Sequence, residues 1–356
     1  MIENVDFLEI LDGQGSPTLL AILVLENGQV IKATAPCVSA MAKYDNTSTR
    51  YQGKGVRHMI NAFKPLFQKA LHGKSLKEVD PILIELKSMG TNFTGALSIA
   101  CIKAEAALNQ KTIYSYLSDD IKMPQLIVNL TQHYMIVPVN PKPINEHIRM
   151  VHDVLYVLED ILLEKHMSLY DPHISYKEKI EIILQAIEEA GFCLGRDVGL
   201  FLNLEGLFQQ QDERYFFDSD VLEKEEYAEQ LVEGLKTYPI VGYENAFDRN
   251  DHQGWQYFTN LISERIKRQV IVAGSHNPKD ANVFTTIPAF EGTITETLEN
   301  LANRGREALV TQSLNVTADT FVVDFALGLQ APFVKFGNIK QRDAYNRLLE
   351  IEHEIF

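Results

Sequence analysis

The sequence predicts an α/β protein in which an N-terminal α+β domain, residues 1–118, precedes a β/α barrel, residues 119–356. Two observations carry this prediction. Residues 1–118 read as strands followed by helices, whereas from residue 119 onward short apolar segments alternate with helix-length segments in six or more units. Alternation of this kind is typical of a parallel sheet, and so many units favour a sheet closed into a barrel. A doubly wound open sheet is the alternative arrangement.

The first domain begins with three expected strands, at residues 7–11, 19–25 and 30–35. Asn27-Gly28 joins the second strand to the third, because Asn-Gly between apolar segments is a strong hairpin signal. In residues 56–71, apolar side chains recur on one helical stripe, which predicts an amphipathic helix. Residues 95–108 are rich in small side chains, so we expect a helix that packs closely against its neighbours.

The second domain is predicted to alternate between helices and short buried strands. The helices are expected at residues 145–166, 175–190, 220–236, 252–268, 293–304, 317–329 and 340–354. The strands are expected at residues 198–202, 240–243, 270–273, 283–286, 308–311 and 333–335. Each expected strand is short and apolar.

Composition and charge limit the class of partner. The chain has 356 residues and a formal net charge of −15, which argues against nucleic acid or an anionic membrane as the main partner. The first six residues are acidic where a signal peptide is basic, and the early apolar run at residues 19–25 is too short to span a bilayer. We therefore expect a cytoplasmic protein that binds neither nucleic acid nor membrane.

The C-terminal part of the chain resembles one known family. Val334-Lys335-Phe336-Gly337 and the helix at 342–352 are similar to the closing strand and helix of enolases, which dehydrate 2-phosphoglycerate in glycolysis. Further matches occur at residues 11–18, 51–56, 278–279 and 291–296. The resemblance implies a three-stranded, four-helix N-terminal domain and an irregular eight-stranded barrel whose second strand is antiparallel. It also implies a homodimer that meets through its N-terminal domains.

Enolases use two Mg²⁺ ions, which neutralise the charge that develops on the substrate carboxylate. The resemblance places three metal-ligand positions on Asn203, Glu244 and Gly274, of which only Glu244 keeps a carboxylate. Because Mg²⁺ gives up water reluctantly, one anionic ligand does not hold it tightly. We therefore expect no cofactor, with Mg²⁺ required only if the family activity survives. The neighbours that would have to replace the lost ligands are Glu205, His276 and Asp280.

The other catalytic positions of the family are also altered. The base, a lysine in enolases, corresponds to Ile287, which cannot accept a proton, and the acid-site glutamate corresponds to His133. The arginine that clamps phosphate corresponds to Ser313, so its bidentate donor fork is lost. The serine of the active-site lid is represented by Ser39, one place out of register.

Lys335 remains at the position of the lysine that holds the substrate carboxylate. One interpretation is a residual substrate-binding site for anions, formed by Lys335 with Gln312 or Gln132. The other is that Lys335 pairs with Glu244 across the end of the barrel and preserves structure, which is the interpretation we favour.

Three functions follow from these residues. The leading hypothesis is an enolase-like pseudoenzyme that acts as a binding or scaffold protein, as a homodimer or with another protein partner. The second is a lyase with a rearranged metal site, which needs side chains that converge at the end of the barrel; the candidates are His133, His276, Glu205, Glu244 and Lys335. The third is a true phosphopyruvate hydratase whose catalytic residues are aligned differently.

Overall fold

The computed structural model describes the chain except residues 36–40, 47–48, 212–213, 219, 275–283, 288–291, 305–307 and 313–315. The chain forms two compact units. The first unit contains Met1–Met123 together with Ile287–Gly305 and Val310–Ala331. The second contains Pro124–Thr286, Arg306–Leu309 and Pro332–Phe356. No helix among the described residues is both long and apolar enough to cross a membrane.

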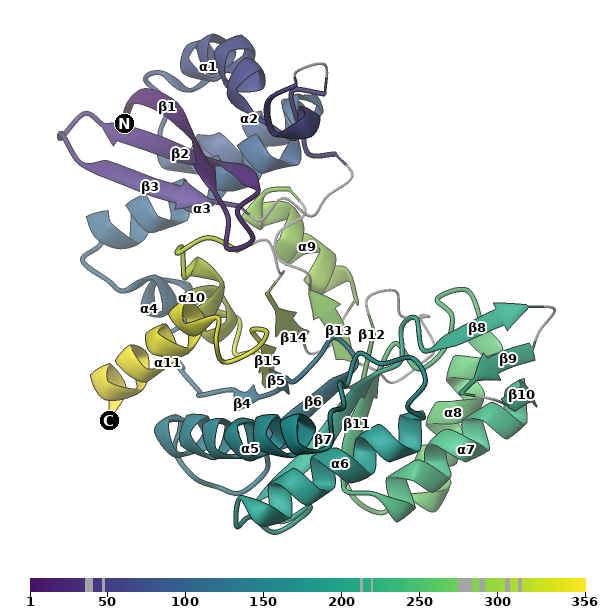
Figure 1. Cartoon of the computed structure of the whole chain (residues 1–356). Coiled ribbons are helices and arrows are strands. Elements are labelled where there is room, and N and C mark those ends of the chain that lie inside the picture. The colour runs from purple at the N-terminus through teal and green to yellow at the C-terminus, as the bar shows by residue number, and fades with distance from the viewer. Residues whose placement is uncertain are drawn as a thin grey trace. The chain divides into compact units, whose positions relative to one another are not determined.

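The first unit is built on a three-stranded antiparallel sheet (Figure 1). Its strands are β1 (Ile2–Leu11), β2 (Pro17–Leu25) and β3 (Val30–Thr34), in that spatial order. Strand β1 begins five residues before the expected strand, because Ile2 pairs with Leu25 at the far end of β2. The turn between β2 and β3 places Gly28 at φ 80°, a left-handed conformation that favours glycine, as the Asn-Gly signal predicted.

Four α-helices follow this sheet in the chain: α1 (Arg57–Leu71), α2 (Val79–Glu85), α3 (Thr91–Leu108) and α4 (Ile113–Leu117). The three strands and four helices confirm the plan that the resemblance implied for this part. Helix α3 is buried along most of its first three turns, and a Cβ on Gly95 would lie 2.9 Å from the carbonyl oxygen of Gly292. This close approach explains why its sequence is rich in small residues.

Two later helices also belong to the first unit: α9 (Ile294–Arg304) and α10 (Phe321–Gly328). The backbone N–H of Ile294 donates to Ser98 Oγ of α3 at 2.9 Å, and Thr295 donates to the carboxylate of Asp80 through both its N–H and its hydroxyl. These bonds satisfy the first N–H groups of α9, which have no partner inside their own helix.

Most residues of the barrel belong to the second unit. The strands of its sheet follow the order β4-β15-β14-β13-β12-β11-β7-β6-β5. Strands β4 (Gln125–Leu126) and β5 (Val128–Asn129) are separated only by Ile127, whose N–H donates to the carbonyl of Val334 at 2.9 Å. The two ends of the strand order are therefore halves of one segment, and the sheet closes on itself as an eight-stranded barrel. The open doubly wound sheet is ruled out.

The remaining barrel strands are β6 (Tyr134–Pro138), β7 (Val198–Asn203), β11 (Ile240–Glu244), β12 (Ile271–Gly274), β13 (Phe284–Ile287), β14 (Ala308–Thr311) and β15 (Phe333–Lys335). Strand β6 is antiparallel to both β5 and β7, whereas β7 is parallel to β11. The reversed second strand that the resemblance implied is thus confirmed. Large apolar side chains fill the barrel interior, among them Met135, Phe201 and Phe333.

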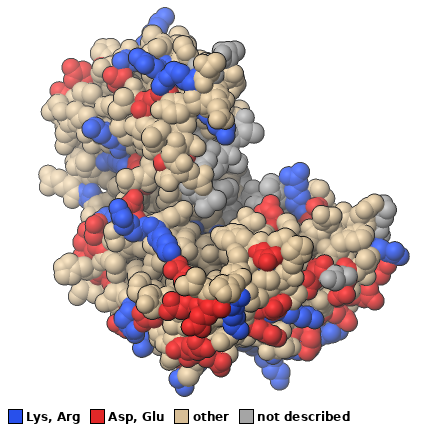
Figure 2. All heavy atoms as spheres, in the orientation of Figure 1, with Lys and Arg blue, Asp and Glu red and all other residues tan. Residues whose placement is uncertain are grey.

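The second unit also contains five helices (Figure 1). They are α5 (Ile144–Glu164), α6 (Tyr176–Glu189), α7 (Lys224–Thr237), α8 (His252–Arg265) and α11 (Arg342–Ile355). Of these, α5, α8 and α11 directly follow barrel strands in the chain. Figure 2 shows many acidic side chains gathered over the helical part of this unit. Glu181 and Glu189 of α6 and Glu229 of α7 are exposed glutamates of this unit.

The helix expected at residues 220–236 begins later than predicted. Residues 220–223 are not helical but form β10 (Asp220–Glu223), which pairs with β9 (Arg214–Phe217) and, through it, with β8 (Phe208–Gln211). The helix begins after Glu223, whose carboxylate accepts from the N3 backbone while Glu226 accepts from the Glu223 N–H at 2.9 Å. This capping box marks the start of the helix.

Candidate functional site

The candidate site lies where the parallel barrel strands end, which we call the barrel mouth. Asn203, Glu244, Gly274 and Lys335 are the last residues of β7, β11, β12 and β15. His133 precedes β6, and because β6 runs in the opposite direction its start lies at the same end of the barrel: Asn203 N–H donates to the His133 carbonyl at 2.9 Å. The fold therefore gathers these side chains at the end of a barrel where catalytic groups usually stand.

Glu244 and Lys335 form an ion pair across the barrel mouth. The Lys335 ammonium donates to Glu244 Oε2, and the side chains are 12% and 2% exposed for Lys335 and Glu244 respectively. Water is largely excluded from this pair, so each charge stabilises the other. The pairing that we favoured from the sequence is confirmed.

The side chain of Asn203 is held by its neighbours. Its Oδ1 accepts from the Glu205 N–H at 3.1 Å and from Asn245 Nδ2 at 3.3 Å, and the same Asn245 amide donates to Glu205 Oε2 at 3.1 Å. Asn245 has a φ of 51°, in the left-handed region that asparagine tolerates better than most residues. Asn203, Glu205 and Asn245 thus form one hydrogen-bonded network on β7 and β11.

The partners of His133 determine its tautomer. Its Nδ1 lies 3.2 Å from the Asn203 carbonyl oxygen, which can only accept, so Nδ1 carries the proton. Its Nε2 then accepts from the amide of Gln132 at 2.7 Å. Burial lowers the pKa of His133, and the positive charge of Lys179 lowers it further, against the opposing effects of the Asn203 carbonyl and Glu205. The imidazole is therefore held neutral.

Two family models together match almost the whole chain. The model described as the enolase N-terminal domain matches residues 2–117, and the one described as the enolase C-terminal TIM barrel domain matches residues 128–356. The chain belongs to the enolase family. The eight-stranded barrel with its antiparallel second strand agrees with this assignment.

The described residues of the barrel mouth do not fit the Mg²⁺ ion that enolases bind. Asn203 has an amide whose oxygen already accepts two hydrogen bonds, Gly274 has no side chain, and the Glu244 carboxylate is bound to an ammonium. Throughout the described part of the chain, no three His, Cys, Asp or Glu side chains are grouped as metal ligands would be. Since hard cations need several anionic oxygen ligands, this donor set does not suit Mg²⁺.

Other predicted site residues lie elsewhere or outside the described structure. Ile287 ends β13, where only its backbone is described. Gln312 follows β14 and belongs to the first unit, where its Oε1 is buried and has no hydrogen-bond partner among the described residues. The predicted residues that fall outside the described ranges are Ser39, His276, Asp280 and Ser313.

Sequence reasoning missed Lys179, a largely buried lysine whose charge lowers the pKa of His133. It lies in the first turn of α6 and is only 8% exposed, whereas Lys177 and Glu178 beside it are exposed. Positions three, four and seven residues further along this helix are all buried and apolar: Ile182, Ile183 and Ala186. A lysine on the apolar stripe of an amphipathic helix was thus a signal in the sequence.

Proposed function

We propose that this member of the enolase family is a pseudoenzyme, which binds a ligand or partner at the barrel mouth but does not dehydrate 2-phosphoglycerate. The ion pair between Glu244 and Lys335 is the observation that carries the proposal. In the family, the corresponding carboxylate holds a metal and the corresponding lysine holds the substrate carboxylate. Here each residue neutralises the other, so neither role is served.

The charge of the substrate explains why losing the metal-binding carboxylate and the substrate-binding lysine is decisive for catalysis. 2-Phosphoglycerate carries a carboxylate and a phosphate, and removal of its carbon-bound proton adds further negative charge that cations must stabilise. The base position carries the hydrocarbon side chain of Ile287, and the phosphate-clamp position carries Ser313. Each such loss lowers rates by orders of magnitude, and together they leave no proton acceptor in the family's position.

The test is a direct absorbance assay for phosphoenolpyruvate with purified protein, Mg²⁺ and 2-phosphoglycerate. We expect no product above the protein-free rate, because base, clamp and metal ligands are absent. An authentic enolase in the same buffer serves as the positive control. Any trace rate must also be measured in a Glu244→Gln variant prepared identically, since a rate that this change leaves intact comes from a contaminant. Mg²⁺-dependent turnover that Glu244→Gln abolishes would refute the proposal.

We also infer that the protein is a cytoplasmic homodimer that meets through its first unit. Strand β1 supports this inference, since it is an edge strand with two exposed leucines, Leu8 and Leu11, each 52% exposed. Exposed apolar residues on a sheet edge favour association with another chain.

Light scattering should give a mass near twice 40.4 kDa at micromolar concentration. The matched variants are Leu8→Lys on the β1 edge and Leu163→Lys on the exposed face of α5. Only the first is expected to shift the mass toward the monomer. A wild-type protein that stays strictly monomeric would contradict the inference.

A further inference from the structure

Two buried tyrosine hydroxyls of the second unit have no hydrogen-bond partner among the residues that the structure describes. They belong to Tyr134 in β6 and Tyr227 in α7, which are 1% and 0% exposed. Burial raises the pKa of both residues, so each hydroxyl keeps its proton at ordinary pH and needs an acceptor. A buried donor without an acceptor is costly, and native proteins rarely contain one.

Tyr134 lies between the outer wall of the barrel and the helices that cover it. Met135, the next residue of β6, fills the barrel interior, and because side chains alternate along a strand, Tyr134 lies on the outer face. Its ring centroid is 6.2 Å from that of Tyr176, the first residue of α6. Tyr243 of β11 also points outward, since its hydroxyl donates to the carbonyl of Leu231 in α7 at 2.9 Å.

Tyr227 lies on the face of α7 that meets the Tyr243 hydroxyl. Tyr227, Leu231 and Gly234 follow one another at the spacing of a single helical face. The Tyr243 hydroxyl bonds to the Leu231 carbonyl, and a Cβ on Gly234 would lie 2.8 Å from its oxygen. Phe217 of β9 links the two helices, because its ring centroid is 5.0 Å from that of the α6 tyrosine and 5.4 Å from that of Tyr227.

We call Tyr134, Tyr176, Tyr227 and Tyr243 the tyrosine cluster. Burial raises the pKa of Tyr176, and the other three tyrosines raise it further, as expected of hydroxyls that lie near one another. Apolar rings surround the cluster: the ring of Tyr227 also contacts those of Phe208 and Phe247, at centroid distances of 5.8 and 5.1 Å. Such rings offer no strong acceptor to a hydroxyl.

We propose that ordered water occupies the tyrosine cluster and accepts the hydroxyl hydrogens of Tyr134 and Tyr227. Water suits the cluster because it also donates, and the oxygens of Tyr176 and Tyr243 have lone pairs that can accept. An ion does not suit it, since its charge would be buried among neutral hydroxyls and aromatic rings. The site lies on the outer face of the barrel wall, so it is independent of the proposed function.

Replacing either tyrosine by phenylalanine tests the proposal through the sign of the change in stability. If water accepts the hydroxyl hydrogen, Tyr134→Phe and Tyr227→Phe each remove a hydrogen bond and should lower the melting temperature by about 1 to 2 °C. If no acceptor is present, the same changes remove an unsatisfied buried hydroxyl and should raise the melting temperature. Phenylalanine keeps the ring, so packing is preserved in both variants.

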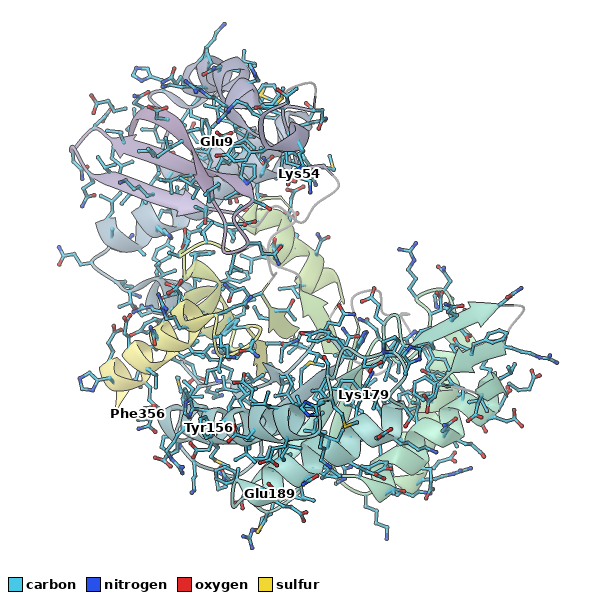
Figure 3. All side chains as sticks on the ribbon, viewed as in Figure 1. Glu9, Lys54, Tyr156, Lys179, Glu189 and Phe356 are labelled. Atoms are coloured by element: carbon cyan, nitrogen blue, oxygen red, sulfur yellow. The ribbon has the colours of Figure 1, made fainter. Side chains whose placement is uncertain are left out.

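Two tyrosines of the same unit provide matched controls. Tyr345 is buried and its hydroxyl donates to the Gly337 carbonyl at 2.7 Å, so Tyr345→Phe should show the loss caused by removing a direct hydrogen bond. Tyr156, on α5 (Figure 3), is 64% exposed, and Tyr156→Phe should leave the melting temperature unchanged. A higher melting temperature in Tyr134→Phe or Tyr227→Phe would overturn the proposal.

A high-resolution crystal structure of the whole chain supplies the second readout. Electron density for water is expected within hydrogen-bonding distance of the Tyr134 and Tyr227 hydroxyl oxygens. In crystals of Tyr227→Phe, the density beside position 227 should weaken or move. Absence of water density beside either hydroxyl of the wild type would overturn the proposal, and so would a direct hydrogen bond from either hydroxyl to a protein group.

Discussion

Replacing Lys335 by methionine is expected to destabilise the protein by about 3 to 5 kcal/mol, because it removes the ammonium that pairs with the buried Glu244 carboxylate. Glu244 is only 2% exposed, so water cannot replace the lost ammonium. Urea unfolding, followed by far-ultraviolet circular dichroism, measures this loss as a lower midpoint.

Two further variants distinguish the contribution of the ion pair to stability from the contribution of side-chain packing. In the double variant Glu244→Leu/Lys335→Met both charges are gone, and most of the stability should return because a well-packed apolar pair can replace a buried ion pair. Lys340→Met is the matched control: Lys340 pairs with Glu159 at an exposed position, and exposed pairs contribute little. A Lys335→Met variant that unfolds at the wild-type midpoint would show that the pair is not what holds Glu244 in place.

Replacing Asp251 by alanine is expected to cost about 3 kcal/mol, because one buried carboxylate serves three partners. Asp251 caps α8 by accepting from the Gly254 N–H at 2.9 Å, accepts from the Tyr215 hydroxyl at 2.7 Å, and lies 3.2 Å from the Lys224 ammonium. Burial, and then the hydrogen bond to Asp251, raise the pKa of Tyr215, so this hydroxyl stays a donor at every ordinary pH. The midpoint of urea unfolding measures the loss.

The conservative variant Asp251→Asn distinguishes the two contributions of this residue. Asparagine keeps an oxygen for the helix cap but has no charge to offset Lys224. The loss of stability in Asp251→Asn should therefore be measurable but smaller than that in Asp251→Ala. Asp343→Ala, at an exposed position in the first turn of α11, is the control and should change the midpoint little. Equal midpoints for Asp251→Ala and Asp343→Ala would contradict this account.

Much of the fold follows from local patterns. The Asn27-Gly28 hairpin, the amphipathic helices and the parallel strands from 198 to 335 all have short-range signals, and the structure places most of them within a few residues of the expected bounds. The segments 125–129 and 134–138 were not assigned as strands from periodicity. They are short, and their pairing depends on β15 and β7, which are distant in the sequence.

The candidate site was only partly predictable. Glu244 and Lys335 are 91 residues apart, and from the sequence their pairing was one of two interpretations. Lys179 was missed because a lysine on a helix is usually exposed, and only packing of α6 shows that this one is not.

By itself, the sequence determined the family and the alternation of strands and helices, because these depend on residue identity and short-range periodicity. Tertiary structure alone decided which charges meet. Closure of the barrel brings the end of β11 opposite the end of β15, so that a carboxylate and an ammonium neutralise each other. Electrostatic energy depends on the distance between charges and on the exclusion of water, and neither can be read from the order of residues alone.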